Sequence, residues 1–165
     1  MEIIRIKRSS RSRNPTFLSN MYKMYVRPHM EYCVEVWNPV YAGDILRLEK
    51  VQNKMTRLLR QGHLLTHAER NSMFRITSHE KRRLRGDMVN IFNNYDNTAL
   101  FTPRNNFRTR GNEKTLKIPT WRKDIRRHSF AYSNLNEWNK LPNHLVSSPS
   151  LNSFKAHLDL YLTEV

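Results

Sequence analysis

The acidic side chains of this sequence are too scattered to hold catalytic metal ions. Two-metal phosphoryl transfer needs carboxylates that cluster around the ions. The chain has five aspartates, none adjacent to another, at positions 44, 87, 96, 124 and 159. Tyr95-Asp96-Asn97 is only superficially similar to a metal-binding Tyr-x-Asp-Asp motif, because the paired aspartates of that motif are missing. We interpret this segment as the end of a helix, and we predict no catalytic residue in the chain.

The histidines and the single cysteine give no better metal site. His29 and Cys33 stand four residues apart, a spacing that could bind a metal from one face of a helix. No second pair accompanies them, and Cys33 lies on the apolar stripe of the same predicted helix, so we expect a buried thiol. His63 and His67 flank a predicted helix start, also without partners. The sequence therefore predicts neither a metal site nor a cofactor.

The chemistry that the composition does favour is anion binding. The 165 residues include 29 Lys and Arg against 14 Asp and Glu, which gives a formal net charge of +15 and a pI near 10.4. Such a chain is expected to bind a polyanion, with nucleic acid as the first partner and an acidic membrane surface as the second. No apolar run approaches 18 residues, so no membrane span is predicted. A lone cysteine and the lack of a signal peptide favour a reducing compartment, the nucleus or the cytoplasm.

Two groups of cations have helical spacing. The first group occupies one face of a predicted helix, opposite Leu48, Met55 and Leu59, and consists of Arg47, Lys50, Lys54 and Arg57. The second group falls in the first two turns of another helix and consists of Lys81, Arg82, Arg83 and Arg85. Cations there oppose the helix dipole, which suggests that an external anion compensates them. We predict phosphate contacts for both groups; the alternative is that both are solvated helix faces.

Further cations lie in a long segment without helical periodicity, residues 96–127. Phe107-Arg108-Thr109-Arg110-Gly111 places an aromatic ring beside guanidinium groups, which suits phosphate contact together with base stacking. The candidate nucleic-acid-binding residues of this segment are Arg108, Arg110, Lys114, Lys117, Arg122 and Lys123. A segment of this length without structure is unusual inside a domain and usually signals function or disorder.

Apolar residues elsewhere recur at helical spacing, so the fold is predicted to be mainly α. We expect an irregular array of about six helices, with one long basic loop and at most one short strand or hairpin. The expected divisions are a basic arm over 1–15, a helical region over 16–95, the basic loop over 96–127 and a pair of helices over 128–165. The spacing assigns Trp37, Trp138 and Phe154 to the core.

Local signals set the expected helix ends. Thr66-x-x-Glu69 and Thr77-x-x-Glu80 are capping boxes, and Asp44 is the expected N-cap of the helix that carries the first basic group. One apolar stripe is predicted before Pro28 and consists of Leu18, Met21, Tyr22, Tyr25 and Val26.

Several segments, read in order, resemble a known family. They are residues 22–39, residues 44–52, Arg82-Arg83-Leu84-Arg85-Gly86-Asp87, Arg108-Thr109-Arg110-Gly111, Asn136-Glu137-Trp138-Asn139-Lys140-Leu141-Pro142 and Ser150-Leu151-Asn152-Ser153-Phe154-Lys155. The series is similar to the carboxy-terminal, post-palm part of the reverse transcriptase polyprotein of non-LTR (LINE-type, jockey-like) retrotransposons. It covers nearly the whole chain from about Lys7.

The resemblance implies a thumb-like fragment of an RNA-directed DNA polymerase. The endonuclease and the catalytic palm with its Mg²⁺ would lie upstream of Met1, and this chain would bind RNA, DNA or an RNA–DNA hybrid. Two alternatives remain open. In the first, the chain is a non-catalytic fragment that docks on the palm through an apolar stripe of Met21, Tyr22, Tyr25, Met30, Val34 and Trp37. In the second, it is an inactive relic.

Overall fold

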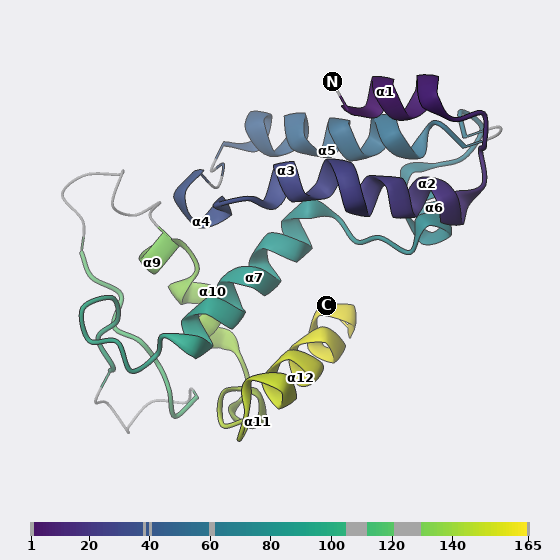
Figure 1. Ribbon diagram of the computed structural model, residues 1–165. Helices are drawn as coiled ribbons and strands as arrows, with labels where there is room; N and C mark the ends of the chain where they lie inside the picture. Colours follow the sequence, from purple (N-terminus) through teal and green to yellow (C-terminus); the bar gives the residue numbers. More distant parts are fainter. Residues whose placement is uncertain are drawn as a thin grey trace. The chain divides into compact units, whose positions relative to one another are not determined.

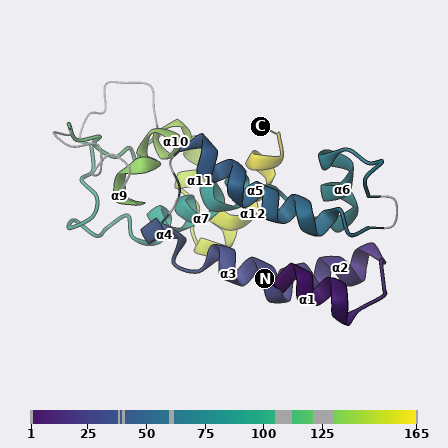
Figure 2. The ribbon, with the colours of Figure 1, turned by 90° about the horizontal axis from the view of Figure 1, so that it is seen from above.

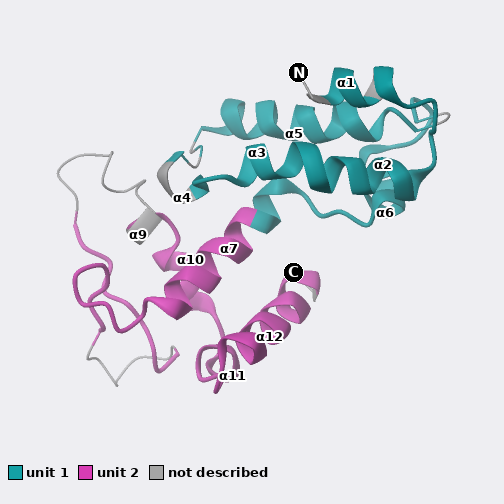
Figure 3. Ribbon diagram, viewed as in Figure 1, with its two compact units in different colours: residues 1–82 teal, residues 83–165 magenta. Residues whose placement is uncertain are grey.

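Helices form most of the chain in the computed structural model, which confirms the predicted mainly-α fold (Figure 1). The structure describes residues 2–37, 39, 41–59, 62–104, 112–120 and 130–164. The chain divides into two compact units, residues 1–82 and 83–165, which Figure 3 distinguishes by colour. Each unit has its own apolar core, and helix α7 (His79–Asn93) begins in the first unit and continues into the second.

Unit 1 begins with a helix where the sequence predicts an arm. Helix α1 (Glu2–Ser9) buries Ile3 and Ile6 in the core of unit 1, so this part of residues 1–15 is not a loose arm. Asn14 then caps helix α2 (Pro15–Met21), because its side-chain oxygen accepts hydrogen bonds from the backbone N–H groups of Thr16 and Phe17. These two apolar residues, three apart, lie on one face of α1 and pack it against the core.

Pro28 does not end the first long helical segment. Helix α2 continues through a π-helical turn, η1 (Tyr22–Val26), into α3 (Arg27–Glu31), which carries Pro28 in its first turn. The wider turn lies just before the proline, which has no N–H to donate and would crowd the carbonyl of the preceding turn. The same turn changes the predicted stripe: Tyr22 and Val26 are buried as expected, but Tyr25 is 49% exposed.

The segment that follows corrects two predictions. Cys33 has a φ of 50° in the turn between α3 and α4 (Val34–Trp37), and its thiol is exposed rather than buried. Because this turn breaks the helical register, Trp37 lies 39% exposed instead of in the core, with its indole N–H donating to the Tyr32 carbonyl at 2.6 Å. The candidate docking stripe is also divided, since Tyr22 is buried and Trp37 is exposed.

Helices α5 (Ala42–Thr56) and α6 (His67–Phe74) complete unit 1 before α7. Both views of the ribbon place α6 near the carboxyl end of α5 (Figures 1 and 2), and residues of the two helices are in contact. Helix α5 begins one turn earlier than predicted, with Tyr41 rather than Asp44 at its N-cap. The capping box at Thr66 and Glu69 is confirmed, whereas α7 is capped by Ser78 and not by Thr77.

The core of unit 2 surrounds Trp138. Its helices are the rest of α7 with α9 (Phe130–Ser133), α10 (Leu135–Lys140), α11 (Asn143–Val146) and α12 (Leu151–Glu164). Trp138 and Phe154 are fully buried, as predicted, with ring centroids 6.0 Å apart. These side chains join α10 to α12, and Phe92 of α7 stacks on Phe154 at 4.3 Å.

The Asn-Glu-Trp-Asn segment fixes part of the predicted basic loop onto this core. The Trp138 indole N–H donates to the Lys114 carbonyl at 2.8 Å, and the Asn139 amide bonds both the backbone N–H and the carbonyl of Leu116 at 2.8 and 2.9 Å. An isolated antiparallel bridge pairs Pro103 with Leu116. Within its described residues, the 96–127 loop is thus irregular but anchored, with Leu116 buried in the core.

Candidate nucleic-acid interface

Helix α5 presents the first group of cations as a continuous row. Arg47, Lys50, Lys54 and Arg57 are all exposed, while Met55 and Leu59 on the opposite side are buried in the core of unit 1, as the sequence predicts. At 1.5 Å per residue the row extends for roughly 15 Å. We call these four residues the α5 row.

Carboxylates neutralise little of the α5 row. Arg47 pairs with Asp44 at 3.0 Å, but both side chains are largely exposed and such pairs contribute little. Glu49 is turned away from the row, because its carboxylate accepts the backbone N–H of His79 at 2.7 Å. Within the described part of the chain, no carboxylate lies at ion-pair distance from Lys50, Lys54 or Arg57. Three adjacent cations therefore remain for an external anion.

The second group of cations has partners inside the protein. Arg82 forms a bidentate pair with Glu31 at 2.6 and 2.8 Å, and Arg85 forms one with Asp159 at 2.5 and 2.9 Å. Arg83 is buried, and Lys81 is exposed. Internal carboxylates thus explain the position of Arg82 and Arg85 in the first turns of α7, and no external anion is needed for these two residues.

The candidate residues of the basic loop are only partly described. Lys114 lies over two rings of the unit 2 core, 5.3 Å from the Phe92 centroid and 5.5 Å from that of Tyr95, so its charge is held by cation–π contacts. Lys117 is exposed. The other four candidates lie outside the described residues, namely Arg108, Arg110, Arg122 and Lys123.

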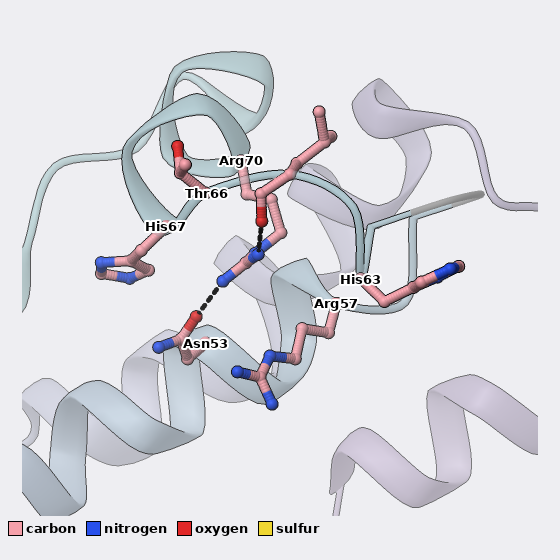
Figure 4. A pocket seen from close by; sticks show the side chains of 7 residues that line it. Asn53, Arg57, His63, Thr66, His67 and Arg70 are labelled. Carbon is pink, nitrogen blue, oxygen red and sulfur yellow. Dashed lines mark hydrogen bonds between the residues drawn. The ribbon is translucent and has the colours of Figure 1, made fainter.

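The sequence did not predict a cationic pocket that adjoins the carboxyl end of the α5 row. The pocket has a volume of about 500 Å³ and is shown in Figure 4. Its lining residues come from α5, α6 and the segment between them, and they are Asn53, Arg57, His63, Leu65, Thr66, His67 and Arg70. Among the described residues, two arginines and two histidines line it, and no carboxylate does. We call it the Arg57–Arg70 pocket.

Arg70 is held at the back of this pocket by neutral groups. Its side chain is only 4% exposed, and it donates to the Thr56 hydroxyl at 3.2 Å, the Gly62 carbonyl at 3.1 Å, the Leu65 carbonyl and the Asn53 amide oxygen. Burial, together with the charge of Arg57, lowers the pKa of Arg70. The hydrogen bonds satisfy the guanidinium, but none of these acceptors cancels its charge.

One acid lies close to the pocket without lining it. Glu69 closes the capping box of α6: its carboxylate accepts from the backbone N–H of Thr66 at 2.7 Å and from the Thr66 hydroxyl at 2.8 Å. The hydrogen bonds from Thr66 lower the pKa of this exposed carboxyl. Glu69 therefore reduces the positive potential nearby but leaves the donors of the pocket unoccupied by a carboxylate.

The described residues offer no site of another kind. They contain no group of three or more histidine, cysteine, aspartate or glutamate side chains that could hold a metal ion. No described helix has the length and apolar character needed to cross a bilayer. Comparison of the chain with protein-family models, curated proteins and solved structures finds no match.

The α5 row could be predicted from the sequence, but the pocket could not, for a physical reason. The histidines at 63 and 67 and the capping box are visible in the sequence, and they mark the loop before α6. The contact that builds the pocket joins Asn53 to Arg70, 17 residues apart on different helices. Nothing in the spacing of these two residues indicates that one fixes the other.

Proposed function

We propose that this chain binds nucleic acid through the α5 row, as the thumb-like fragment of a non-LTR retrotransposon reverse transcriptase. One observation carries the proposal: Lys50, Lys54 and Arg57 form an exposed line of cations without carboxylate partners in the described chain. Their spacing suits successive phosphates of one strand, and the net charge of +15 attracts any polyanion. The resemblance to the family supplies the polymerase context.

A binding mode based on phosphates predicts the substrate class. Contacts to phosphates set register without reading base edges, and an A-like helix is recognised by its shape and its 2′-hydroxyls. Phosphate contacts imply little sequence preference, and the resemblance to a reverse transcriptase implies that the partner is an RNA–DNA hybrid or structured RNA. Catalysis and Mg²⁺ would belong to the separate palm.

Filter binding of the full chain to a 20-base-pair hybrid at several salt concentrations tests the proposal. We expect log affinity to fall linearly with log salt, and unrelated sequences to bind within a few fold of one another. Affinity that is insensitive to salt would contradict the proposal.

A second function is favoured by the exposed aromatic residues at the α3–α5 end of unit 1. Tyr32 and Tyr41 are each 75% exposed, and Trp37 is 39% exposed. Such a surface suits docking on a palm domain. Docking through apolar side chains would hold or strengthen as salt rises, whereas phosphate binding would weaken, so the same titration separates the two functions.

A further inference from the structure

We propose that the Arg57–Arg70 pocket binds a terminal phosphate group of a nucleic-acid strand. The inference rests on the proposed function, because the α5 row ends at Arg57, which also lines the pocket. A strand that follows the row would bring its end to this point. Three properties of the pocket carry the inference: its charge, the orientation of its donors and its shape.

The charge of the pocket favours a group with more than one negative charge. Arg57 is exposed at the wall, and Arg70 lies behind it with only neutral acceptors. A cation that is buried among neutral groups gains more from an added anion than a solvated one does, because less water screens the interaction. A terminal phosphate carries about −1.5 to −2 at pH 7, compared with one charge on an internal phosphodiester.

The amide of Asn53 is oriented as a donor. Its oxygen accepts from Arg70 Nη2 at 2.5 Å, so the NH₂ group is directed away from Arg70 (Figure 4). The guanidinium has only donors, which excludes the flipped amide. Arg70 therefore fixes Asn53 to present N–H to a ligand.

The ring of His67 is oriented by a chain of hydrogen bonds from the core. The Tyr22 hydroxyl donates to Gln52 Oε1 at 2.9 Å, and Gln52 Nε2 donates to Asn71 Oδ1 at 3.4 Å. With its oxygen occupied, Asn71 turns its NH₂ group toward His67 Nε2, 3.3 Å away. The tautomer of His67 that accepts this hydrogen bond at Nε2 carries its proton on Nδ1. Its remaining ring nitrogen is thus a donor as well.

The shape of the pocket favours the end of a strand. Donors come from α5, from α6 and from the segment between them, so groups from three parts of the chain can contact one phosphate. About 500 Å³ is in the range of small-ligand pockets and accommodates a phosphate with part of its sugar. An internal phosphate would need the strand to leave on both sides. Inorganic phosphate and a mononucleotide share the same chemistry and serve as separate probes.

The test compares three labelled 12-mer oligonucleotides of one sequence, bearing a phosphate at the 5′ end, at the 3′ end or at neither. Fluorescence anisotropy with the full chain should show one phosphorylated form binding about tenfold more tightly than the unphosphorylated form, as expected for charge-assisted hydrogen bonds. Equal affinity of all three would overturn the inference.

The variant Asn53→Asp probes the pocket without removing its support. The new carboxylate would pair with Arg70, so the melting temperature should hold or rise, while the pocket loses a donor and gains a negative charge. Preference for the phosphorylated oligonucleotide should disappear. The matched control Ala68→Asp adds the same charge on α6 at an exposed position outside the lining and should retain most of the preference. Loss of preference in both variants, or in neither, would count against the pocket.

A second variant and a small probe separate this inference from the proposed function. His67→Leu removes the ring donor and should also abolish the preference. Tight, salt-dependent binding with equal affinity for oligonucleotides with and without a terminal phosphate would agree with binding by the α5 row. It would refute only the inference about the pocket. If no oligonucleotide binds, the proposed function is wrong. A titration with AMP or inorganic phosphate, followed by the NMR shifts of His67 and Asn53, then still tests whether the pocket binds a phosphate group. Absence of shifts would then refute it.

Discussion

Removal of the Trp138 side chain would open the core of unit 2. Trp138 is fully buried and packs against Phe154 and Tyr95, with ring centroids at 6.0 and 6.3 Å. A Trp→Ala change in a core typically costs about 3–5 kcal/mol in the free energy of unfolding. The Lys114 carbonyl would also lose its indole donor, which adds roughly 1 kcal/mol or more if the carbonyl stays dry. We therefore expect Trp138→Ala to destabilise unit 2 by about 4–6 kcal/mol.

That cost approaches the whole stability of the unit. A unit of about 80 residues has a free energy of unfolding of roughly 4–12 kcal/mol. Hydrogen exchange measured by mass spectrometry reports on each unit separately, so the amides of α10 and α12 should lose protection while those of α2 and η1 keep it. Trp138→Phe is the matched control: it retains one aromatic ring but loses the N–H donor and part of the indole volume, so it should cost about 2–3 kcal/mol, less than Trp138→Ala. A loss below 1 kcal/mol for Trp138→Ala would refute the assignment of this residue to the core.

Two further substitutions test unit 1. Burial raises the pKa of Glu31, but the hydrogen bonds and charge of Arg82, with smaller effects from Arg27 and His79, lower it overall. The Glu31 carboxylate therefore stabilises the fold fully above its ordinary pKa near 4.3. This stabilisation is lost as the pH falls through the pKa of the folded state. Glu31→Gln should therefore cost about 1 kcal/mol at pH 7 and less at pH 3 in urea titrations, and equal costs would contradict the pair. Cys33→Gly should stabilise the chain by about 0.5–1 kcal/mol in thermal melts, because glycine adopts a φ of 50° without strain. Cys33→Ala is the control, because alanine does not relieve this strain. A gain in stability from alanine would contradict the explanation.

The features that could be predicted from the sequence depend on neighbours within a few residues. Thr66 and Glu69 form their capping box because both halves of the motif lie in one turn. The exposed face of α5 follows from spacing alone, since buried Met55 fixes which side faces the core. Trp138 and Phe154 are large apolar side chains at helical spacing, and burial is their most favourable state.

The features that could not be predicted depend on contacts far apart in the chain or on backbone irregularities. Arg82 and Arg85 find carboxylates 51 and 74 residues away, and no periodicity indicates those pairings. The spacing places Cys33 and Trp37 on one apolar stripe only if the helix is regular, and the turn at Cys33 ends that register. The Arg57–Arg70 pocket needs the contact of α5 with α6.

The most direct test of nucleic-acid binding by the α5 row is the salt dependence of a triple variant, Lys50→Gln, Lys54→Gln and Arg57→Gln. Each cation that contacts a phosphate contributes about 0.9 to the slope of log affinity against log salt on a duplex. Glutamine is nearly as good a helix former as lysine or arginine, so far-ultraviolet circular dichroism should be unchanged. The matched control removes the same charge from unit 2 by Arg104→Gln, Lys140→Gln and Lys155→Gln. If the α5 row binds nucleic acid, the α5 variant should lower the slope by about 2–3, while the control should lower it by less than about 1. Equal slopes for the α5 variant and the unmodified chain would contradict it.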